Sequence, residues 1–174
     1  NTDVYGFVEN LKAEAPGFDL AAGPALVLGA GGAARAVIAG LLAGGGPEIR
    51  LANRDAGKAG ALAARFGERV RVVGWTDRHR ALKGAHLLVN STSLGMTGQP
   101  ALDLDLAALS KTALVHDIVY VPLFTPLLLA AQARGNPIVD GLGMLLHQAR
   151  PGFRQWFGCE PEVTPELRQA VLSA

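Results

Sequence analysis

Short apolar runs alternate with longer segments in which apolar residues recur three and four positions apart. The short runs suit strands buried on both faces, and the longer segments indicate helices. Gly and Pro stand at many of the boundaries between them. The pattern predicts helices over residues 2–15, 33–43, 56–66, 76–82, 125–134, 142–150 and 166–172, and strands over residues 25–28, 48–52, 70–73, 86–90, 114–119 and 137–140.

Strands and helices alternate along the whole of this pattern. Such alternation predicts an α/β fold, a Rossmann-type doubly wound parallel sheet of about six strands with flanking helices. Ligands of such sheets bind beyond the carboxyl ends of the strands. The residues of interest therefore follow the predicted strands directly, at positions 29–34, 53–55, 90–96, 118–120 and 140–143.

A glycine-rich loop follows the first predicted strand. Its sequence, Gly29-Ala30-Gly31-Gly32-Ala33-Ala34, has the form G-x-G-x-x-A between a strand and a helix. The first glycine permits a tight turn, the second lets the backbone approach a pyrophosphate, and the final alanine lets the helix pack closely on the strand. The free N–H groups at the helix start bind phosphate. We therefore predict dinucleotide contacts at Gly29, Ala30, Gly31, Gly32 and Ala33.

The end of the second predicted strand bears on the choice between NADP and NAD. Asn53 occupies the place where NAD-binding domains often carry an acid for the ribose 2′-hydroxyl, and Arg54 follows it. A neutral amide, a guanidinium and Lys58 one helical turn later favour a 2′-phosphate, hence NADP. Asp55 leaves an alternative open. It either caps the next helix, or it binds ribose hydroxyls and shifts the preference toward NAD.

Composition narrows the class of protein. The chain has 174 residues, 49% hydrophobic and 18% charged, which suits one folded domain with a full core. The net charge of +1, without a basic block, argues against nucleic-acid binding. Pro122 and Pro126 interrupt the most apolar stretch, so we expect no membrane span. The single cysteine, Cys159, favours a reducing, cytoplasmic setting, and the histidines lack the spacing of metal ligands.

Two further groups of residues receive structural interpretations. Asp103 and Asp105 alternate with leucines, and we expect them to cap a helix. Phe153, Trp156 and Phe157 are expected to anchor the last helices against the core or against another domain.

Several motifs together resemble one family. They occur in the same order along essentially the whole chain, which makes the match far more specific than any one of them. The chain closely resembles shikimate dehydrogenase in Asn1-Thr2-Asp3, Gly6-Phe7, Gly29 to Ala36, Asn53-Arg54, Asn90 to Met96, Asp117 to Tyr120 with Pro122, Thr125 to Leu128, and Asp140 to Ala149.

The resemblance implies NADP-linked, reversible reduction of 3-dehydroshikimate to shikimate. It also implies two domains, a substrate domain followed by a Rossmann domain. This chain corresponds to the second, over residues 1–174, with 1–20 as a linking helix and 142–174 as closing helices. Because the chain begins with Asn1 and a helix follows at once, we expect it to be the carboxyl-terminal part of a longer protein.

The resemblance also assigns roles to single residues. Asp3 matches an aspartate that pairs with a catalytic lysine and contacts the substrate hydroxyls. The remaining matches concern cofactor and substrate contacts: Arg54 for the 2′-phosphate, Asn90 and Thr92 for the loop beside the cofactor, Ile118 and Gly141 for the nicotinamide, and Tyr120 and Gln148 for the substrate. The family commonly has Thr where this chain has Asp55, which weakens the NADP prediction. The catalytic lysine and the carboxylate-binding serines belong to the first domain, outside this chain.

Two alternatives remain. The first is a quinate/shikimate dehydrogenase of looser specificity that uses NAD, which Asp55 keeps open. The second is a nucleotide-binding module without catalysis of its own. The resemblance also allows a homodimer.

Overall fold

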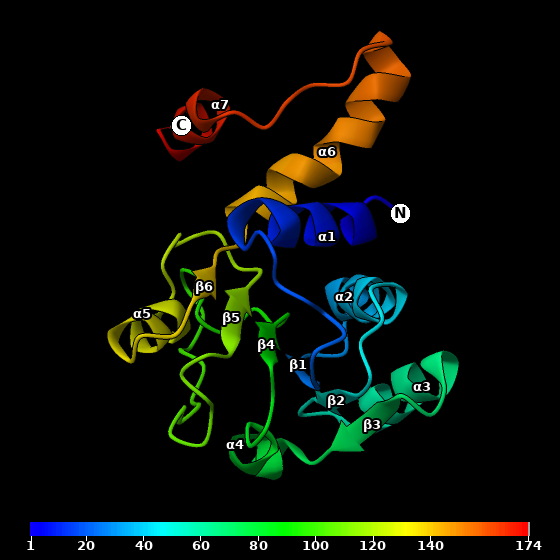
Figure 1. The fold of residues 1–174 in the computed structure, drawn as a ribbon, viewed down its shortest axis with the longest axis vertical. Helices are drawn as coiled ribbons and strands as arrows, with labels where there is room; N and C mark the ends of the chain where they lie inside the picture. Colours follow the sequence, from blue (N-terminus) through cyan, green and yellow to red (C-terminus); the bar gives the residue numbers. More distant parts are fainter. Residues whose placement is uncertain (174) are drawn as a thin grey trace.

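Six parallel strands form one sheet at the centre of the computed structural model, which describes residues 1–173 (Figure 1). Their order across the sheet is β3-β2-β1-β4-β5-β6, and every neighbouring pair is parallel. The order reverses between β1 and β4, the switch point at which doubly wound sheets bind ligands. The predicted Rossmann-type fold is confirmed. The strands are β1 (Ala25–Leu28), β2 (Ile49–Ala52), β3 (Val70–Val73), β4 (Leu87–Asn90), β5 (Leu114–Asp117) and β6 (Ile138–Val139).

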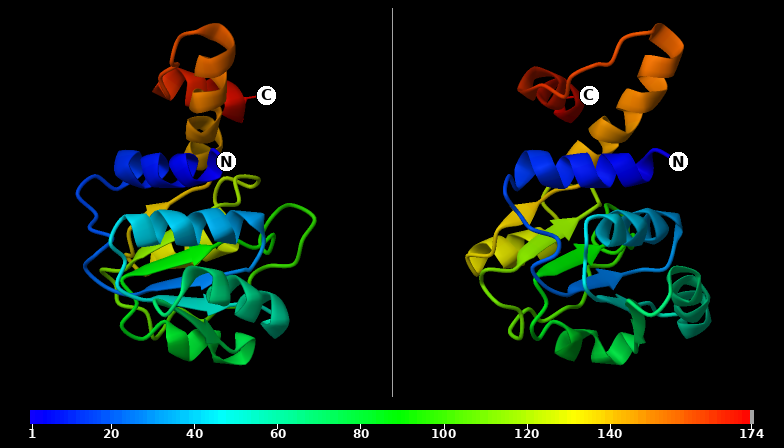
Figure 2. Two further views of the ribbon diagram at one scale, coloured as in Figure 1. Left: turned by 90° about the vertical axis from the view of Figure 1, so that its right-hand side faces the viewer. Right: turned by 45° about the vertical axis from the view of Figure 1, so that its right-hand side comes forward.

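Helices cover both faces of this sheet. The first three α-helices and the start of α6 pack on one face, whereas η1, α4, α5 and the segment 94–109 pack on the other. Figure 2 shows α1 lying outside α2, and α6 projecting away from the sheet. The helices are α1 (Asp3–Glu14), α2 (Gly32–Ala43), α3 (Ala56–Phe66), the 3₁₀ helix η1 (Trp75–Asp77), α4 (Arg78–Ala81), α5 (Pro126–Ala133), α6 (Leu142–Phe157) and α7 (Pro165–Leu172).

The central strand β1 shows why both layers of helices are needed. All four of its residues are buried. Val27 faces the core under α1, α2 and α3, and its neighbours Leu26 and Leu28 face the opposite core. Because successive side chains of a strand point to opposite faces, an unbroken apolar run requires an apolar layer on each side.

The helices α1 and α6 pack against each other through two glycines, one on each helix. A Cβ atom at Gly6 would lie 2.6 Å from the carbonyl oxygen of Met144 and 2.8 Å from the Cβ atom of Gln148. Gly143 approaches the side chain of Asn10 in the same way, since an added Cβ atom would overlap its Oδ1 atom. The helix α1 and the first half of α6 are therefore held side by side.

Most predicted boundaries agree with the structure to within about two residues, and those of β1, β3 and α3 match fully. The predicted end of the sixth helix at residue 150 is wrong, because α6 continues through Pro151 to Phe157. Pro151 removes a single backbone hydrogen bond, the one to the carbonyl group of His147, and the remaining hydrogen bonds of α6 carry the helix past it. No helix among residues 1–173 is both long and apolar enough to span a membrane.

The expected roles of several other side chains are also corrected. Asp103 and Asp105 cap no helix, because residues 101–106 form an irregular segment. Asp103 instead pairs with Arg78, and Asp105 accepts a hydrogen bond from the backbone of Ala107. The aromatic residues at the end of α6 do not anchor it to the core, since they are exposed: Phe153, Trp156 and Phe157. Their expected contact with another domain stays a prediction.

A buried histidine lies between α1 and the sheet. His116 of β5 is fully buried and stacks on Phe7, with ring centroids 5.3 Å apart. The side-chain amide of Asn10 donates to the Asp140 carbonyl at 2.8 Å and lies 3.3 Å from His116 Nε2. Because that amide nitrogen faces Nε2, the imidazole nitrogen acts as the acceptor and carries no proton. Burial lowers the pKa of His116 to about 3, and a hydrogen bond with the Asp140 backbone opposes this fall to a smaller extent.

This low pKa predicts a pH-dependent stability. Between pH 6.5 and about 3 the unfolded chain binds a proton at this site that the folded chain does not, so acidification favours unfolding. We expect the loss of unfolding free energy between pH 7.5 and 5.0 to be smaller in His116→Gln by about 2 kcal/mol. Urea denaturation at the two pH values measures it. His79→Gln, at a partly exposed histidine, is the control. An unchanged pH dependence in His116→Gln would show that the native imidazole takes up the proton.

Candidate functional site

The glycine loop turns sharply at the carboxyl end of β1. Gly29 has φ +107°, and a Cβ atom there would lie 2.7 Å from Ser91 Oγ. Ser91 in turn donates a hydrogen bond to the Leu28 carbonyl at 2.6 Å, which ties this loop to the one after β4. Only glycine combines a positive φ with so close a neighbour.

The start of α2 is open to an anion. The N-cap residue is Gly31, which has no side chain to cap the helix, and the first turn holds no acidic residue. Cβ atoms built at Gly31 and Gly32 meet nothing within 4 Å, so a ligand can approach the backbone here. The first N–H groups of a helix have no partner within it and carry a partial positive charge. The loop therefore has the geometry that a pyrophosphate requires.

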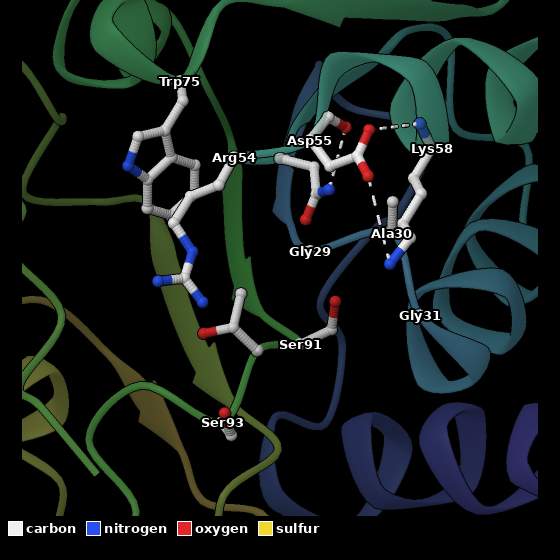
Figure 3. Close-up of a pocket in the computed structure, with 11 residues that line it drawn as sticks. Gly29, Ala30, Gly31, Arg54, Asp55, Lys58, Trp75, Ser91 and Ser93 are labelled. Atoms are coloured by element: carbon white, nitrogen blue, oxygen red, sulfur yellow. Dashed lines mark hydrogen bonds and ion pairs between the residues drawn. The ribbon is translucent and has the colours of Figure 1, made fainter.

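A cleft of about 450 Å³ runs from this loop across the ends of β2, β3 and β4 (Figure 3). Figure 3 shows Trp75 and Arg54 at one end and the glycine loop at the other. The cleft is lined by Gly29, Ala30, Gly31, Asn53, Arg54, Asp55, Lys58, Trp75, Ser91, Thr92 and Ser93.

The charged side chains of the loop after β2 differ in whether they have partners within the protein. Asp55 caps α3, because its Oδ1 atom accepts a hydrogen bond from the Lys58 backbone at 3.0 Å. Its Oδ2 atom lies 4.0 Å from Lys58 Nζ. Asn53 donates from its amide to the Asp55 carbonyl at 2.9 Å. The exposed Arg54 makes no ion pair or side-chain hydrogen bond with the described residues, so its guanidinium is available to an anion in the cleft.

Asn90 supports the loop after β4 from behind. It is fully buried, and its amide donates to Leu94 at 3.1 Å and to Asp117 Oδ1 at 2.9 Å. Its Oδ1 atom accepts hydrogen bonds from the Thr92 backbone at 3.1 Å and the Thr92 hydroxyl at 2.7 Å. Thr92, which lines the cleft, is therefore positioned by Asn90.

The buried carboxyl group of Asp117 joins three segments. Besides the amide of Asn90, it accepts hydrogen bonds from the Val119 backbone at 3.1 Å and the Thr125 hydroxyl at 2.7 Å. Thr125 is also the N-cap residue of α5. Burial raises the pKa of Asp117 to about 6, and the three hydrogen bonds oppose this rise. Asp117 thus fixes the ends of β4 and β5 relative to α5, although it does not itself line the cleft.

A second, smaller cleft of about 180 Å³ lies where α1, α2 and α6 meet the ends of β5 and β6. Its wall gathers residues from distant parts of the sequence. They are Asp3, Ala33, Ile118, Tyr120, Gly141, Met144, Leu145 and Gln148.

The floor of this second cleft requires a glycine. A Cβ atom at Gly141 would overlap the carbonyl group of Ile118, so the loops after β5 and β6 touch backbone to backbone. Tyr120 extends from the first of these loops with 43% of its surface exposed. The carboxylate of Asp3 forms no ion pair or hydrogen bond with the other described residues. Polar groups of α1 and of the loop after β5 therefore face a concave surface and have no partner there.

The structure brings most of the predicted residues together in these two clefts. Gly32 and Asn90 line neither of them. Gly32 is exposed at the start of α2, and Asn90 acts through Thr92. Among the described residues, no group of three or more His, Cys, Asp or Glu side chains could hold a metal ion.

Sequence reasoning did not assign several lining residues. Ser91 and Ser93 lie within positions 90–96, which directly follow a predicted strand and were therefore of interest. Trp75 follows β3 in the same way, and the end of that strand should have been included. Met144 and Leu145 follow from the helical register of Gln148, because residues three and four apart share a face.

Two family models match the chain. Residues 11–98 match Shikimate / quinate 5-dehydrogenase, and residues 141–172 match Shikimate 5′-dehydrogenase C-terminal domain. The chain is 62% identical to the shikimate dehydrogenase (NADP(+)) of Paramagnetospirillum magneticum, over 99% of the chain and 63% of that protein. It is 61% identical to the protein of the same name from Dinoroseobacter shibae, over 99% of the chain and 62% of that protein. The chain thus spans under two thirds of the length of these relatives.

Solved structures agree with this relationship. Quinate dehydrogenase from Corynebacterium glutamicum in complex with NAD has a TM-score of 0.91 at 35% identity, over 100% of this chain and 62% of that one. Shikimate 5-dehydrogenase from Thermus thermophilus in complex with NADP(H) and shikimate has a TM-score of 0.79 at 41% identity, over 93% of this chain and 58% of that one. Since the first family model alone matches just over half of the 174 residues, the chain belongs to the shikimate / quinate 5-dehydrogenase family.

Proposed function

We propose that this chain is the cofactor-binding part of an NADP-dependent shikimate dehydrogenase, which reversibly reduces 3-dehydroshikimate to shikimate. The observation that carries the proposal is the second cleft. It gathers Asp3, Ile118, Tyr120, Gly141 and Gln148, the residues to which the family resemblance gives substrate and nicotinamide roles. The names of the relatives from Paramagnetospirillum magneticum and Dinoroseobacter shibae support the choice of reaction and cofactor.

The larger cleft fits the phosphates of NADP. The open backbone at Gly31 and Gly32 suits the pyrophosphate, and Arg54 and Lys58 suit the 2′-phosphate. The cofactor supplies the hydride when it is bound. The chain's own contribution is to orient it, with the nicotinamide directed toward Ile118 and Gly141. Ala33 lines the second cleft and Ala30 the first, so the two clefts meet at the start of α2.

In the second cleft we assign substrate contact to Asp3, Tyr120 and Gln148. A free carboxylate can accept hydrogen bonds from substrate hydroxyls, but when ionised it is a poor proton donor at neutral pH. We therefore assign proton delivery to the lysine of the family's first domain, with Asp3 holding and orienting that lysine. Residues 1–20 would then link the two domains, and residues 142–174 would close the cofactor domain. The cytoplasmic location and the homodimer stay predictions.

An NAD-dependent quinate/shikimate dehydrogenase is the second candidate. The high TM-score to a quinate dehydrogenase in complex with NAD supports it. The local geometry favours NADP, because the carboxylate of Asp55 is engaged at the start of α3 and the guanidinium of Arg54 is free. A carboxylate that caps a helix repels a nearby phosphate less than one that points into the cleft.

The first prediction from this proposed function concerns cofactor choice. We expect this chain to bind NADP⁺ more tightly than NAD⁺ in calorimetry. Arg54→Ala should weaken NADP⁺ binding by about tenfold or more, because it removes a charge-assisted hydrogen bond, and should leave NAD⁺ binding nearly unchanged. Arg71→Ala, at an exposed arginine on β3, is the matched control. A preference for NAD⁺ in the unsubstituted chain would refute the NADP assignment.

The second prediction concerns the chain in isolation. Because the catalytic lysine belongs to the family's first domain, the isolated chain should bind dinucleotide and oxidise no shikimate. NADPH formation, followed by absorbance with shikimate and NADP⁺ in excess, measures this. Measurable turnover would mean that the chain carries its own proton-transfer group and that our division of roles is wrong.

The third prediction concerns Asp3 in an enzyme of full family length. Asp3→Asn should lower kcat by about a hundredfold or more, because the amide cannot hold the lysine as the carboxylate does. The affinity for NADP⁺ should change little, since Asp3 lies outside the larger cleft. Steady-state kinetics and calorimetry test the two halves. Glu9→Gln, which changes another acid of α1, is the control. Wild-type kcat in Asp3→Asn would show the assignment to be wrong.

A further inference from the structure

Trp75 occupies a place in the larger cleft to which no role has yet been given. It is the first residue of η1, directly after β3, and it lines the cleft together with Arg54. Figure 3 shows its indole beside the Arg54 side chain, at the end of the cleft away from the glycine loop. It is the one aromatic residue among those that line this cleft in the described part of the chain.

The indole is held in place by a buried arginine. The Cζ atom of Arg78 lies 4.7 Å from the centroid of the Trp75 ring, within the range of a cation–π contact. Only 7% of the surface of Arg78 is exposed. Its guanidinium donates to the Trp75 carbonyl at 2.7 Å, to the Asp103 carbonyl at 3.0 and 2.7 Å, and to Asp103 Oδ2 at 3.1 Å.

These contacts make Arg78 a fixed support. Its nitrogen atoms already have partners within the protein, so Arg78 cannot turn to bind an anion in the cleft. It covers the indole and locks η1 to the segment that contains Asp103. The indole is therefore a preset surface, and a ligand that stacks on it does not have to order it first.

The contents of the cleft decide which part of a dinucleotide meets this surface. The phosphate-binding groups are the glycine loop at one end and Arg54 and Lys58 along the side. The indole stands at the end beyond Arg54, whereas the hydroxyl-bearing loop after β4 begins beside the glycine loop at Ser91. The described lining residues include no cation besides Arg54 and Lys58. A flat, uncharged ring system suits that end better than a phosphate does, because aromatic faces stack.

We propose that Trp75 is the stacking wall of the adenine subsite, that it contributes directly to the affinity for the adenosine half of the cofactor, and that Arg78 is its positioning residue. The proposal rests on the proposed dinucleotide function and names a contact within it. It predicts that the binding of ligands with an adenine ring depends on Trp75 and that the binding of ligands without one does not.

The two tryptophans of the chain allow a direct test. Trp156 lies on α6 with 79% of its surface exposed, so Trp156→Phe leaves Trp75 as the single emitter in a chain whose cleft is unchanged. We expect NADP⁺ and ADP-ribose 2′-phosphate to change Trp75 emission and to protect it from acrylamide quenching, both with saturation. Nicotinamide mononucleotide should do neither. The oxidised cofactor is used because NADPH would absorb the tryptophan emission.

Substitution of Trp75 itself gives the second arm. Trp75→Ala should weaken NADP⁺ binding about tenfold, as expected for the loss of one base–aromatic stack, and Trp75→Phe should keep most of the affinity. Circular dichroism confirms that each variant is folded. If calorimetry shows NADP⁺ binding while Trp75 emission and the Kd of Trp75→Ala stay unchanged, the adenine subsite lies elsewhere and the dinucleotide function stands. If the unsubstituted chain binds no dinucleotide, the proposed function fails, and this proposal fails with it.

Discussion

Leu28, Ala52, Asn90 and Asp117 lie side by side at the carboxyl ends of four neighbouring strands. This register is the constraint on which both clefts depend, because it brings the loops after β1, β2, β4 and β5 to one edge of the sheet. The backbone of each strand hydrogen-bonds to its neighbours, so no loop can shift along its strand alone. The loops carry the groups to which we assign ligand binding, and the sheet fixes the distances between them.

The strand register alone does not fix the loops, and hydrogen bonds between buried polar groups hold them in place as well. Asp117 accepts hydrogen bonds from Asn90, Val119 and Thr125, which belong to three different segments. Removing a carboxylate that satisfies several buried donors costs more than the net value of any one bond, since each donor is left without a partner. On the other side, the contact at Gly6 holds α1 against α6, and with them Asp3 and Gln148. Rigid support at both ends is what a site needs if it is to align a cofactor with a substrate.

The sequence was most informative where local chemistry decides the structure. The four buried residues of β1, the glycine turn and the cap at Asp55 follow from rules that act within a few positions, and all three are found. The length of α6 was underestimated, because local rules end a helix near a proline, whereas the loss of one hydrogen bond at Pro151 does not stop α6 from continuing to Phe157. Asp103 was misread for a related reason. Its partner Arg78 lies 25 positions away, and only the fold brings them together. The family resemblance supplied the proposed roles of Asp3, Tyr120 and Gln148, and of these only Tyr120 also lies at a position that directly follows a predicted strand.

The charge distribution explains how a nearly neutral chain can suit a phosphate-rich ligand. The net charge is only +1. What matters is which charges are available near the cleft, because a cation held closely by a carboxylate offers less to a ligand than one in looser contact, such as Lys58 at 4.0 Å from Asp55. Arg78 is engaged by Asp103, and Arg50 by Glu48. Arg54 is free, and the start of α2 adds unpaired N–H groups that do not count in the formal charge. Arg54 and the start of α2 thereby give the larger cleft an attraction for phosphate that the net charge does not reveal.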